Sequence, residues 1–97
     1  MPAFVYILAS KRNGTLSTGS CGNPAERIHQ HRIGKGSKFA WKHKVFRLVY
    51  LEAHDRTTDA LTRERQIKTW KRDWKLALIE AQNPDWRDLY DDLNNWL

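Results

Sequence analysis

Residues 4–19, FVYILASKRNGTLSTG, are the stretch that decides the fold of this chain. Residues 4–9 are rich in β-branched and aromatic side chains and are too few for a stable helix, which predicts a strand. Asn13-Gly14 then favours a tight turn, because both residues adopt positive φ at low steric cost. Residues 15–19 are therefore predicted to return antiparallel to the first strand as a β-hairpin.

Side chains on the two predicted strands alternate between the faces of the hairpin. Phe4, Tyr6 and Leu8 share one face of the first strand. Ser17 and Gly19 share one face of the second strand, so that Tyr6 and Ser17 can project to the same side. The hairpin therefore offers a phenol and a hydroxyl on one common surface.

A helix is predicted directly after the hairpin. Asn23 is suited to cap it, Pro24 to occupy its first position, and Glu26 to complete the cap three residues later. The helix should run to about Ile33 and stop at Gly34, before a flexible basic loop.

The remaining elements complete a small mixed fold. Residues 45–51, VFRLVYL, predict a third strand, and residues 57–71 and 74–81 predict two further helices. The resulting order, β-β-α-β-α-α, predicts an α/β protein of the α+β type. Its expected centre is a small three-stranded, antiparallel-containing sheet flanked by helices.

Residues 82–97 form an acidic, tryptophan-containing C-terminal segment. Its apolar side chains fall at helical spacing, at Trp86, Leu89, Tyr90, Leu93, Trp96 and Leu97. We expect this segment to pack as a short helix on the rest of the chain, so that residues 1–97 make one domain.

The composition limits the class of protein to which the chain can belong. The formal charge is +6 and the pI is about 9.8, which suggests a polyanionic partner, although solubility alone explains such a charge equally well. Cys21 is the single cysteine, which excludes an internal disulfide and fits a reducing compartment. No apolar run approaches the roughly 20 residues of a membrane span, and the N-terminus lacks a basic signal region. We therefore expect a cytoplasmic protein without a membrane contact.

Three polar residues on the predicted helices are candidates for function. Arg27 and His31 are four residues apart and share one face of the first helix. Glu64 lies three residues before Ile67 on an apolar stripe, where a carboxylate is costly unless it is paired or binds a metal. From the pattern alone, an ion pair of Glu64 with Arg27 or Lys68 is the favoured interpretation.

Together these residues resemble the signature of the GIY-YIG nucleases, and the chain is similar to the small single-domain bacterial members. Val5-Tyr6-Ile7 corresponds to the first signature tripeptide and Ser17-Thr18-Gly19 to the second. Arg27, His31 and Glu64 then follow on helices, in the order of the family pattern. The similarity spans nearly the whole chain and is therefore more specific than either tripeptide.

The resemblance also includes residues 63–70, RERQIKTW, and 83–89, NPDWRDL, which are similar to the Glu-bearing helix and the C-terminal segment of those members. The chain departs from the pattern at Val5, which replaces a glycine in an ordinary strand. Ser17 replaces the second tyrosine and removes a phenol from the face that should meet the scissile phosphate. Ser20-Cys21 stands where small members carry Val and Thr.

The resemblance implies hydrolysis of phosphodiesters in DNA with one divalent cation, Mg²⁺ or Mn²⁺, and family habit suggests DNA repair. Glu64 would hold the metal, and Arg27 would pair with the phosphate and stabilise charge in the transition state. Tyr6 is the better candidate for general base, and His31 would orient Tyr6 or protonate the leaving oxygen. Ser17 cannot match a tyrosine in reach or acidity, so we expect a weakened nuclease. The alternative is a catalytically silent nucleic-acid-binding or adaptor module.

A basic stretch interleaved with aromatic residues follows the first helix. Cations suit phosphates and a ring can stack on an unpaired base, although Phe39 and Trp41 serve equally well as anchors of the loop to the core. The residues predicted to contact nucleic acid are Arg32, Lys35, Lys38, Trp41, Lys42, Lys44 and Lys68.

Overall fold

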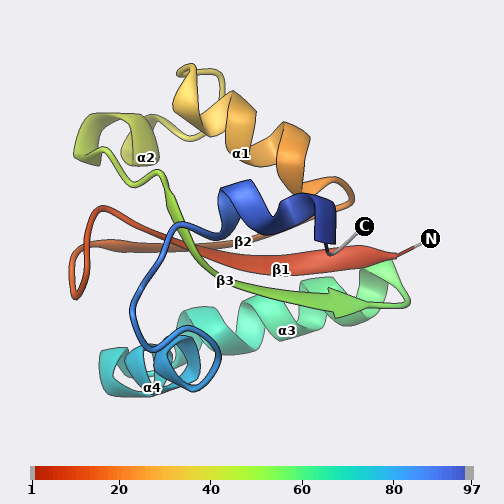
Figure 1. The fold of residues 1–97 in the computed structure, drawn as a ribbon. Helices are drawn as coiled ribbons and strands as arrows, with labels where there is room; N and C mark the ends of the chain where they lie inside the picture. Colours follow the sequence, from red (N-terminus) through yellow and green to blue (C-terminus); the bar gives the residue numbers. More distant parts are fainter. Residues whose placement is uncertain (1, 96–97) are drawn as a thin grey trace.

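The computed structural model describes residues 2–95 and contains a three-stranded sheet with helices on both faces (Figure 1). In chain order the elements are β1 (Ala3–Ala9), β2 (Leu16–Cys21), α1 (Pro24–Arg32), α2 (Lys38–His43), β3 (Arg47–His54), α3 (Thr57–Thr69), α4 (Arg72–Gln82) and the 3-10 helix η1 (Leu89–Asn95). The strand order is β2-β1-β3 and both strand pairs are antiparallel, which confirms the predicted class of fold.

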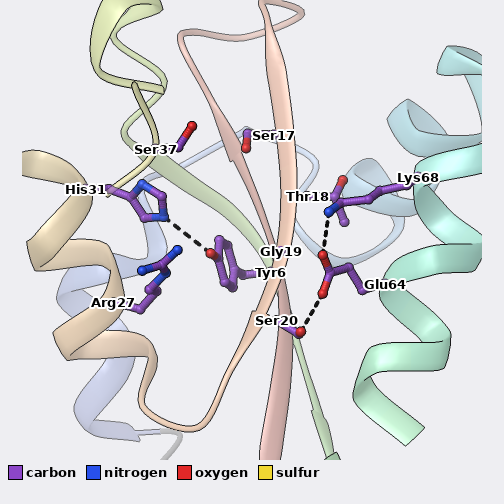
Figure 2. Close-up of a pocket in the computed structure, with 10 residues that line it drawn as sticks. All are labelled: Tyr6, Ser17, Thr18, Gly19, Ser20, Arg27, His31, Ser37, Glu64 and Lys68. Carbon is purple, nitrogen blue, oxygen red and sulfur yellow. Dashed lines mark hydrogen bonds and ion pairs between the residues drawn. The ribbon is translucent and has the colours of Figure 1, made fainter. Parts of the chain in front are cut away.

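The helices are divided between the two faces of the sheet. Helices α1 and α2 and the 3-10 helix η1 cover one face, whereas α3 and α4 cover the other (Figure 1). Strand β2 is an edge strand, and it runs between α1 on one side and α3 on the other (Figure 2). Side chains from both helices can therefore reach the same edge of the sheet.

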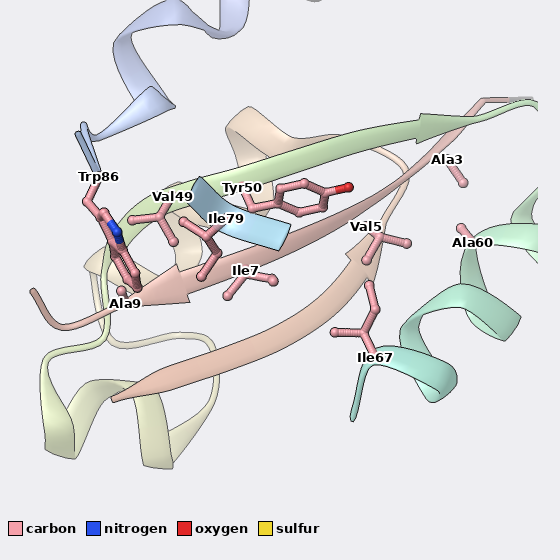
Figure 3. Packing of buried hydrophobic residues seen from close by; sticks show 10 residues of the cluster. All are labelled: Ala3, Val5, Ile7, Ala9, Val49, Tyr50, Ala60, Ile67, Ile79 and Trp86. Carbon is pink, nitrogen blue, oxygen red and sulfur yellow. The ribbon is translucent and has the colours of Figure 1, made fainter. Parts of the chain in front are cut away.

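The central strand β1 is buried along its whole length and supplies two separate cores. Phe4, Tyr6 and Leu8 belong to the core on the α1 side. Val5 and Ile7 belong to the core on the α3 side (Figure 3). The predicted alternation of this strand is confirmed, and burial on both faces explains why the strand has no charged residue.

The hairpin register and the start of α1 agree with the sequence predictions. Tyr6 lies opposite Gly19, and Ser17, two residues along β2, projects to the same side of the sheet. The Asn23 side chain caps α1 by accepting a hydrogen bond from the Glu26 backbone N–H at 3.2 Å. The site therefore begins from a hairpin and a helix whose local sequences specify them.

Helix α2 is an element that the sequence did not predict, and it occupies Lys38–His43, between the predicted basic loop and the predicted third strand. The Ser37 hydroxyl caps it by accepting from the Ala40 N–H at 3.3 Å, and Lys44 ends it in a left-handed conformation with φ 55°. Val45 was predicted to begin the third strand. Its N–H instead donates to the Ala40 carbonyl at 2.9 Å, which closes the helix end, and β3 begins at Arg47.

The C-terminal segment runs across both layers of the molecule. Trp86 is fully buried in the core on the α3 side, and Leu89 and Leu93 are buried on the α1 side. Trp96 and Leu97, which were also predicted to pack, lie outside the described residues. In the described part of the chain, no helix is long and apolar enough to cross a membrane.

Asn83 holds the start of this segment against the sheet. It is 3% exposed, and its amide nitrogen donates to the Val49 carbonyl at 3.1 Å and to the Arg87 carbonyl at 2.8 Å. Its amide oxygen accepts from the Arg87 N–H at 3.1 Å. One buried amide therefore satisfies backbone groups of both β3 and the turn that carries Trp86.

Candidate functional site

A pocket of about 250 Å³ lies around the edge strand β2 and brings the predicted catalytic residues together (Figure 2). Strands β1 and β2 contribute to its floor, and helices α1 and α3 supply opposite walls. The residues that line the pocket are Tyr6, Ser17, Thr18, Gly19, Ser20, Arg27, His31, Ser37, Glu64 and Lys68. All five residues predicted from the sequence to act in catalysis are among them.

The first wall is formed by Tyr6 from β1 and by two residues one turn apart on α1. The Tyr6 phenol lies over Gly19, where an added Cβ would come within 2.4 Å of its hydroxyl oxygen. The same oxygen lies 3.3 Å from Nε2 of His31, and the two rings meet edge to face. Arg27 lies below His31 on the same side of the helix and points toward the phenol (Figure 2).

The surroundings of this wall set the protonation of Tyr6 and His31. Burial raises the pKa of Tyr6, and Arg27 offsets this only in part. Burial also lowers the pKa of His31, and the positive charge of Arg27 lowers it further. At neutral pH the phenol is therefore protonated and the imidazole is neutral, and the tautomer that carries its proton on Nδ1 accepts a hydrogen bond from the Tyr6 hydroxyl at Nε2. This arrangement suits a histidine that orients Tyr6 and accepts a proton from it.

The second wall is formed by Glu64 and Lys68 on α3 and by Ser20 on β2. The Ser20 hydroxyl donates to one carboxylate oxygen of Glu64, and the Lys68 ammonium pairs with the other, each at 2.5 Å. The Glu64 side chain is 16% exposed and that of Lys68 is 53% exposed. Burial opposes ionisation of Glu64, but Lys68 and Ser20 together bring its pKa below the ordinary value. The carboxylate is therefore charged and fixed in place at neutral pH.

The ion pair with Lys68, which the sequence offered as the simpler interpretation of Glu64, is thus present, and Glu64 still lines the pocket. Across residues 2–95, no group of three or more His, Cys, Asp or Glu side chains is placed to hold a metal ion. A single carboxylate nevertheless suits Mg²⁺, which keeps several waters and is commonly bound by one or two carboxylates plus phosphate oxygens. The Glu64 carboxylate is therefore chemically suited to bind one such cation.

Ser20 and Ser37 are pocket residues that the sequence analysis did not assign to the site. Ser20 was noted only as a departure from the family pattern, and its contact with Glu64 joins residues 44 apart in the chain. Ser37 enters the pocket as the N-cap of α2, an element that was not predicted. Ser20 could have been suspected from the sequence, because it is a polar residue next to Gly19 on a predicted strand. Nothing in the sequence points to Ser37.

The predicted nucleic-acid-binding residues divide into three sets, one of which is Lys68, which lines the pocket and pairs with Glu64. A second set is exposed on α2 and its flanking loops, and comprises Lys35, Lys38, Trp41, Lys42 and Lys44. Arg32 is different, because its guanidinium pairs with Asp88 at 2.6 Å, donates to the Phe46 carbonyl at 3.2 Å and lies over the Tyr90 ring. The structure therefore shows Arg32 engaged in holding the C-terminal segment, and its contact with nucleic acid stays a prediction.

Comparison with known proteins gives a consistent family. A family model described as the GIY-YIG catalytic domain matches residues 2–77. The UPF0213 protein SH2523 of Staphylococcus haemolyticus is 40% identical over 79 residues, which cover 81% of this chain and 95% of that protein. A UPF0213 protein of Staphylococcus aureus is 38% identical with the same coverage. The solution NMR structure of the UPF0213 protein BH0048 from Bacillus halodurans has a TM-score of 0.57 and 30% identity, over 91% of this chain and 93% of that one.

Proposed function

Because this chain belongs to the GIY-YIG catalytic domain family, whose members are generally nucleases, we propose that it is a metal-dependent endonuclease that hydrolyses phosphodiester bonds in DNA. The observation that carries the proposal is the convergence of Tyr6, Arg27, His31 and Glu64 on one pocket at the β2 edge. A protonated phenol against a neutral imidazole can transfer protons, a guanidinium can stabilise charge on a phosphate, and a charged carboxylate can bind a metal ion, all of which contribute to hydrolysis of a phosphodiester.

The proposed reaction assigns one task to each side chain. Arg27 pairs with the scissile phosphate and stabilises the negative charge that develops on its oxygens. Tyr6 accepts a proton from the attacking water while it passes its own proton to Nε2 of His31, so that no free phenolate is needed beforehand. The new P–O bond forms as the bond to the leaving oxygen breaks. A divalent cation held by Glu64 would supply positive charge at that oxygen.

A nicking assay on supercoiled plasmid DNA tests this proposal. The wild type should convert plasmid to the nicked form in Mg²⁺ or Mn²⁺ and not in EDTA, and Glu64→Ala and Arg27→Ala should each lose about 10²-fold or more in rate. Glu80→Ala, which removes an exposed carboxylate from α4, is the matched control and should cleave normally. If the wild type and Ser17→Tyr are equally inert on every nucleic acid tried, the enzymatic function is wrong.

A silent nucleic-acid-binding or adaptor module is the second candidate, and the pairing of Glu64 with Lys68 favours it, because the carboxylate already has a cationic partner. The two candidates differ in their response to metal. An endonuclease should gain thermal stability in Mn²⁺ and lose that gain in Glu64→Ala, since ligands stabilise the state that binds them. A silent module should show no such difference between the two proteins.

A further inference from the structure

Helix α2 carries a large aromatic side chain that is half exposed and yet held in place. The Trp41 side chain is 53% exposed. Its ring packs against that of Phe46, with centroids 5.8 Å apart, and against Gly34, where an added Cβ would lie 3.4 Å from the indole. Phe46 and Gly34 thus support the indole while about half of Trp41 stays exposed, and such a ring can serve as a stacking platform.

The helix that carries the platform begins at the pocket. Trp41 and Ser37 are one helical turn apart, and the Trp41 N–H donates to the Ser37 carbonyl at 3.1 Å. Ser37 itself lines the pocket opposite Ser17 (Figure 2). One turn of helix is about 5.4 Å, so a nucleotide adjoining a phosphate in the pocket would place its base within reach of the indole.

The charge around the platform suits a polyanion. The sequence has no acidic residue between Glu26 and Glu52. The lysines of α2 and its flanking loops are all exposed, at positions Lys35, Lys38, Lys42 and Lys44. An apolar protein partner would need the ring but not this concentration of cations, and paired bases hide their faces inside the duplex. Single-stranded nucleic acid uses both features, since its phosphates meet cations while its bases stack on aromatic rings.

We propose that Trp41 stacks on an unpaired base beside the phosphate held in the pocket, so that the preferred substrate carries single-stranded nucleotides at the cleavage site. The proposal rests on the proposed nuclease function for the location of that phosphate. Binding to the platform itself requires neither metal nor turnover, and the two ideas can therefore fail separately.

The test compares two strands with equal phosphate charge. Fluorescence anisotropy in EDTA measures the affinity of the wild type for a short labelled single-stranded DNA and for a strand of equal length whose internal positions are abasic. We expect the strand with bases to bind about five-fold or more tightly, as stacking on one ring provides. Trp41→Leu should reduce this ratio to near one, and Trp41→Phe should keep part of it.

Two control variants make the result specific to the platform. Trp74→Leu removes a side chain on α4 that is 57% exposed, and it should leave the ratio unchanged. Lys42→Gln should weaken the binding of both strands by the same factor, because it removes a phosphate contact only. The thermal midpoint of Trp41→Leu should stay close to that of the wild type, since the indole is half exposed.

The proposal is overturned if the wild type does not distinguish the two strands, if Trp41→Leu keeps the full ratio, or if Trp74→Leu loses it as well. It is also overturned if blunt duplex DNA binds as tightly as the strand with bases, since paired bases offer no face to stack on. If the protein binds the strand with bases more tightly than the abasic strand but does not cleave DNA in Mg²⁺ or Mn²⁺, the stacking platform is supported and the nuclease function is wrong. If the protein cleaves DNA but binds both strands equally, the nuclease function is supported and the stacking platform is wrong.

Discussion

Gly19 lies beneath the Tyr6 phenol, and replacing it by alanine tests whether the position of that phenol matters. An added Cβ would lie 2.4 Å from the Tyr6 hydroxyl oxygen and 2.5 Å from Cζ of the ring, whereas ordinary contact begins at 3.4 Å. The hydroxyl must therefore retreat by about 1 Å. Tyr6 is only 3% exposed, and this movement alters the geometry of its hydrogen bond to His31.

Gly19→Ala should reduce the cleavage activity much more than the stability of the protein. Overpacking a buried site costs about 1–3 kcal/mol, and replacing glycine by alanine returns about 0.4–1 kcal/mol by restricting the unfolded chain. We expect Gly19→Ala to lower the free energy of unfolding by about 1–2 kcal/mol, which leaves the protein folded. A displacement of 1 Å in a catalytic group can cost about 10²-fold in rate, so the cleavage rate should fall much further than stability does.

Urea denaturation and single-turnover cleavage measure the two effects on the same samples. Gly22→Ala is the matched control, because an added Cβ there meets nothing within 4 Å; it should keep the cleavage rate and raise the free energy of unfolding by about 0.4–1 kcal/mol. The reasoning is refuted if Gly19→Ala cleaves at the wild-type rate, or if Gly22→Ala loses as much activity. A crystal structure of Gly19→Ala would then show whether Tyr6 had moved without consequence.

Three further predictions concern protons, metal and folding. In the proposed reaction His31 must be neutral to accept the proton of Tyr6, and burial and Arg27 lower the pKa of His31. The cleavage rate should therefore be flat from about pH 7 to 9 and fall below about pH 6.5. A tenfold rise in the cleavage rate per pH unit between about pH 7 and 9 would instead indicate that a free Tyr6 phenolate is the base. Lys68→Met removes the partner of Glu64 and should strengthen Mn²⁺ binding by up to about five-fold, because a half-exposed ion pair is worth at most about 1 kcal/mol. Calorimetry without DNA measures this affinity, and an unchanged affinity contradicts the prediction. Asn83→Ala should lower the free energy of unfolding, measured by urea denaturation, by about 3–5 kcal/mol, because it leaves buried backbone groups without hydrogen-bond partners. A loss below about 1 kcal/mol would show that water replaces the amide.

The parts of the fold that the sequence predicts correctly are those with local causes. Strand β1 follows from its β-branched composition, and α1 follows from Asn23 and Pro24 at its start. Helix α2 is different, because it has only six residues, and its ends depend on the Ser37 cap and on the left-handed Lys44. Its apolar run, which includes the buried Val45, has no clear helical period. The hydrophobic Val45 next to β3 therefore predicts a strand from the sequence, whereas in the structure it closes the end of α2.

The candidate site shows the same division between local and tertiary information. Tyr6, Arg27 and His31 can be placed from strand alternation and from the spacing of one helical turn, and the pocket brings them together. The contact of Ser20 with Glu64 could not be predicted, since it depends on how α3 lies against the edge strand. The pairing of Arg32 with Asp88, 56 residues later in the chain, could not be predicted for the same reason, and the contact of Arg32 with nucleic acid stays a prediction.

Ser17 determines how the pocket can handle protons. A serine hydroxyl is too short to reach Tyr6 across the strand pair and does not ionise at physiological pH. Among the described residues that line the pocket, His31 is therefore the neutral group that can accept a proton in the proposed reaction. It does so through the phenol of Tyr6. The space beside Ser17 is bordered instead by Ser37, one turn before the exposed indole of Trp41. A tyrosine at position 17 would put a bulky ring into this space. The serine thus removes a second phenol from the chemistry and leaves the part of the pocket next to Ser37 without a bulky ring.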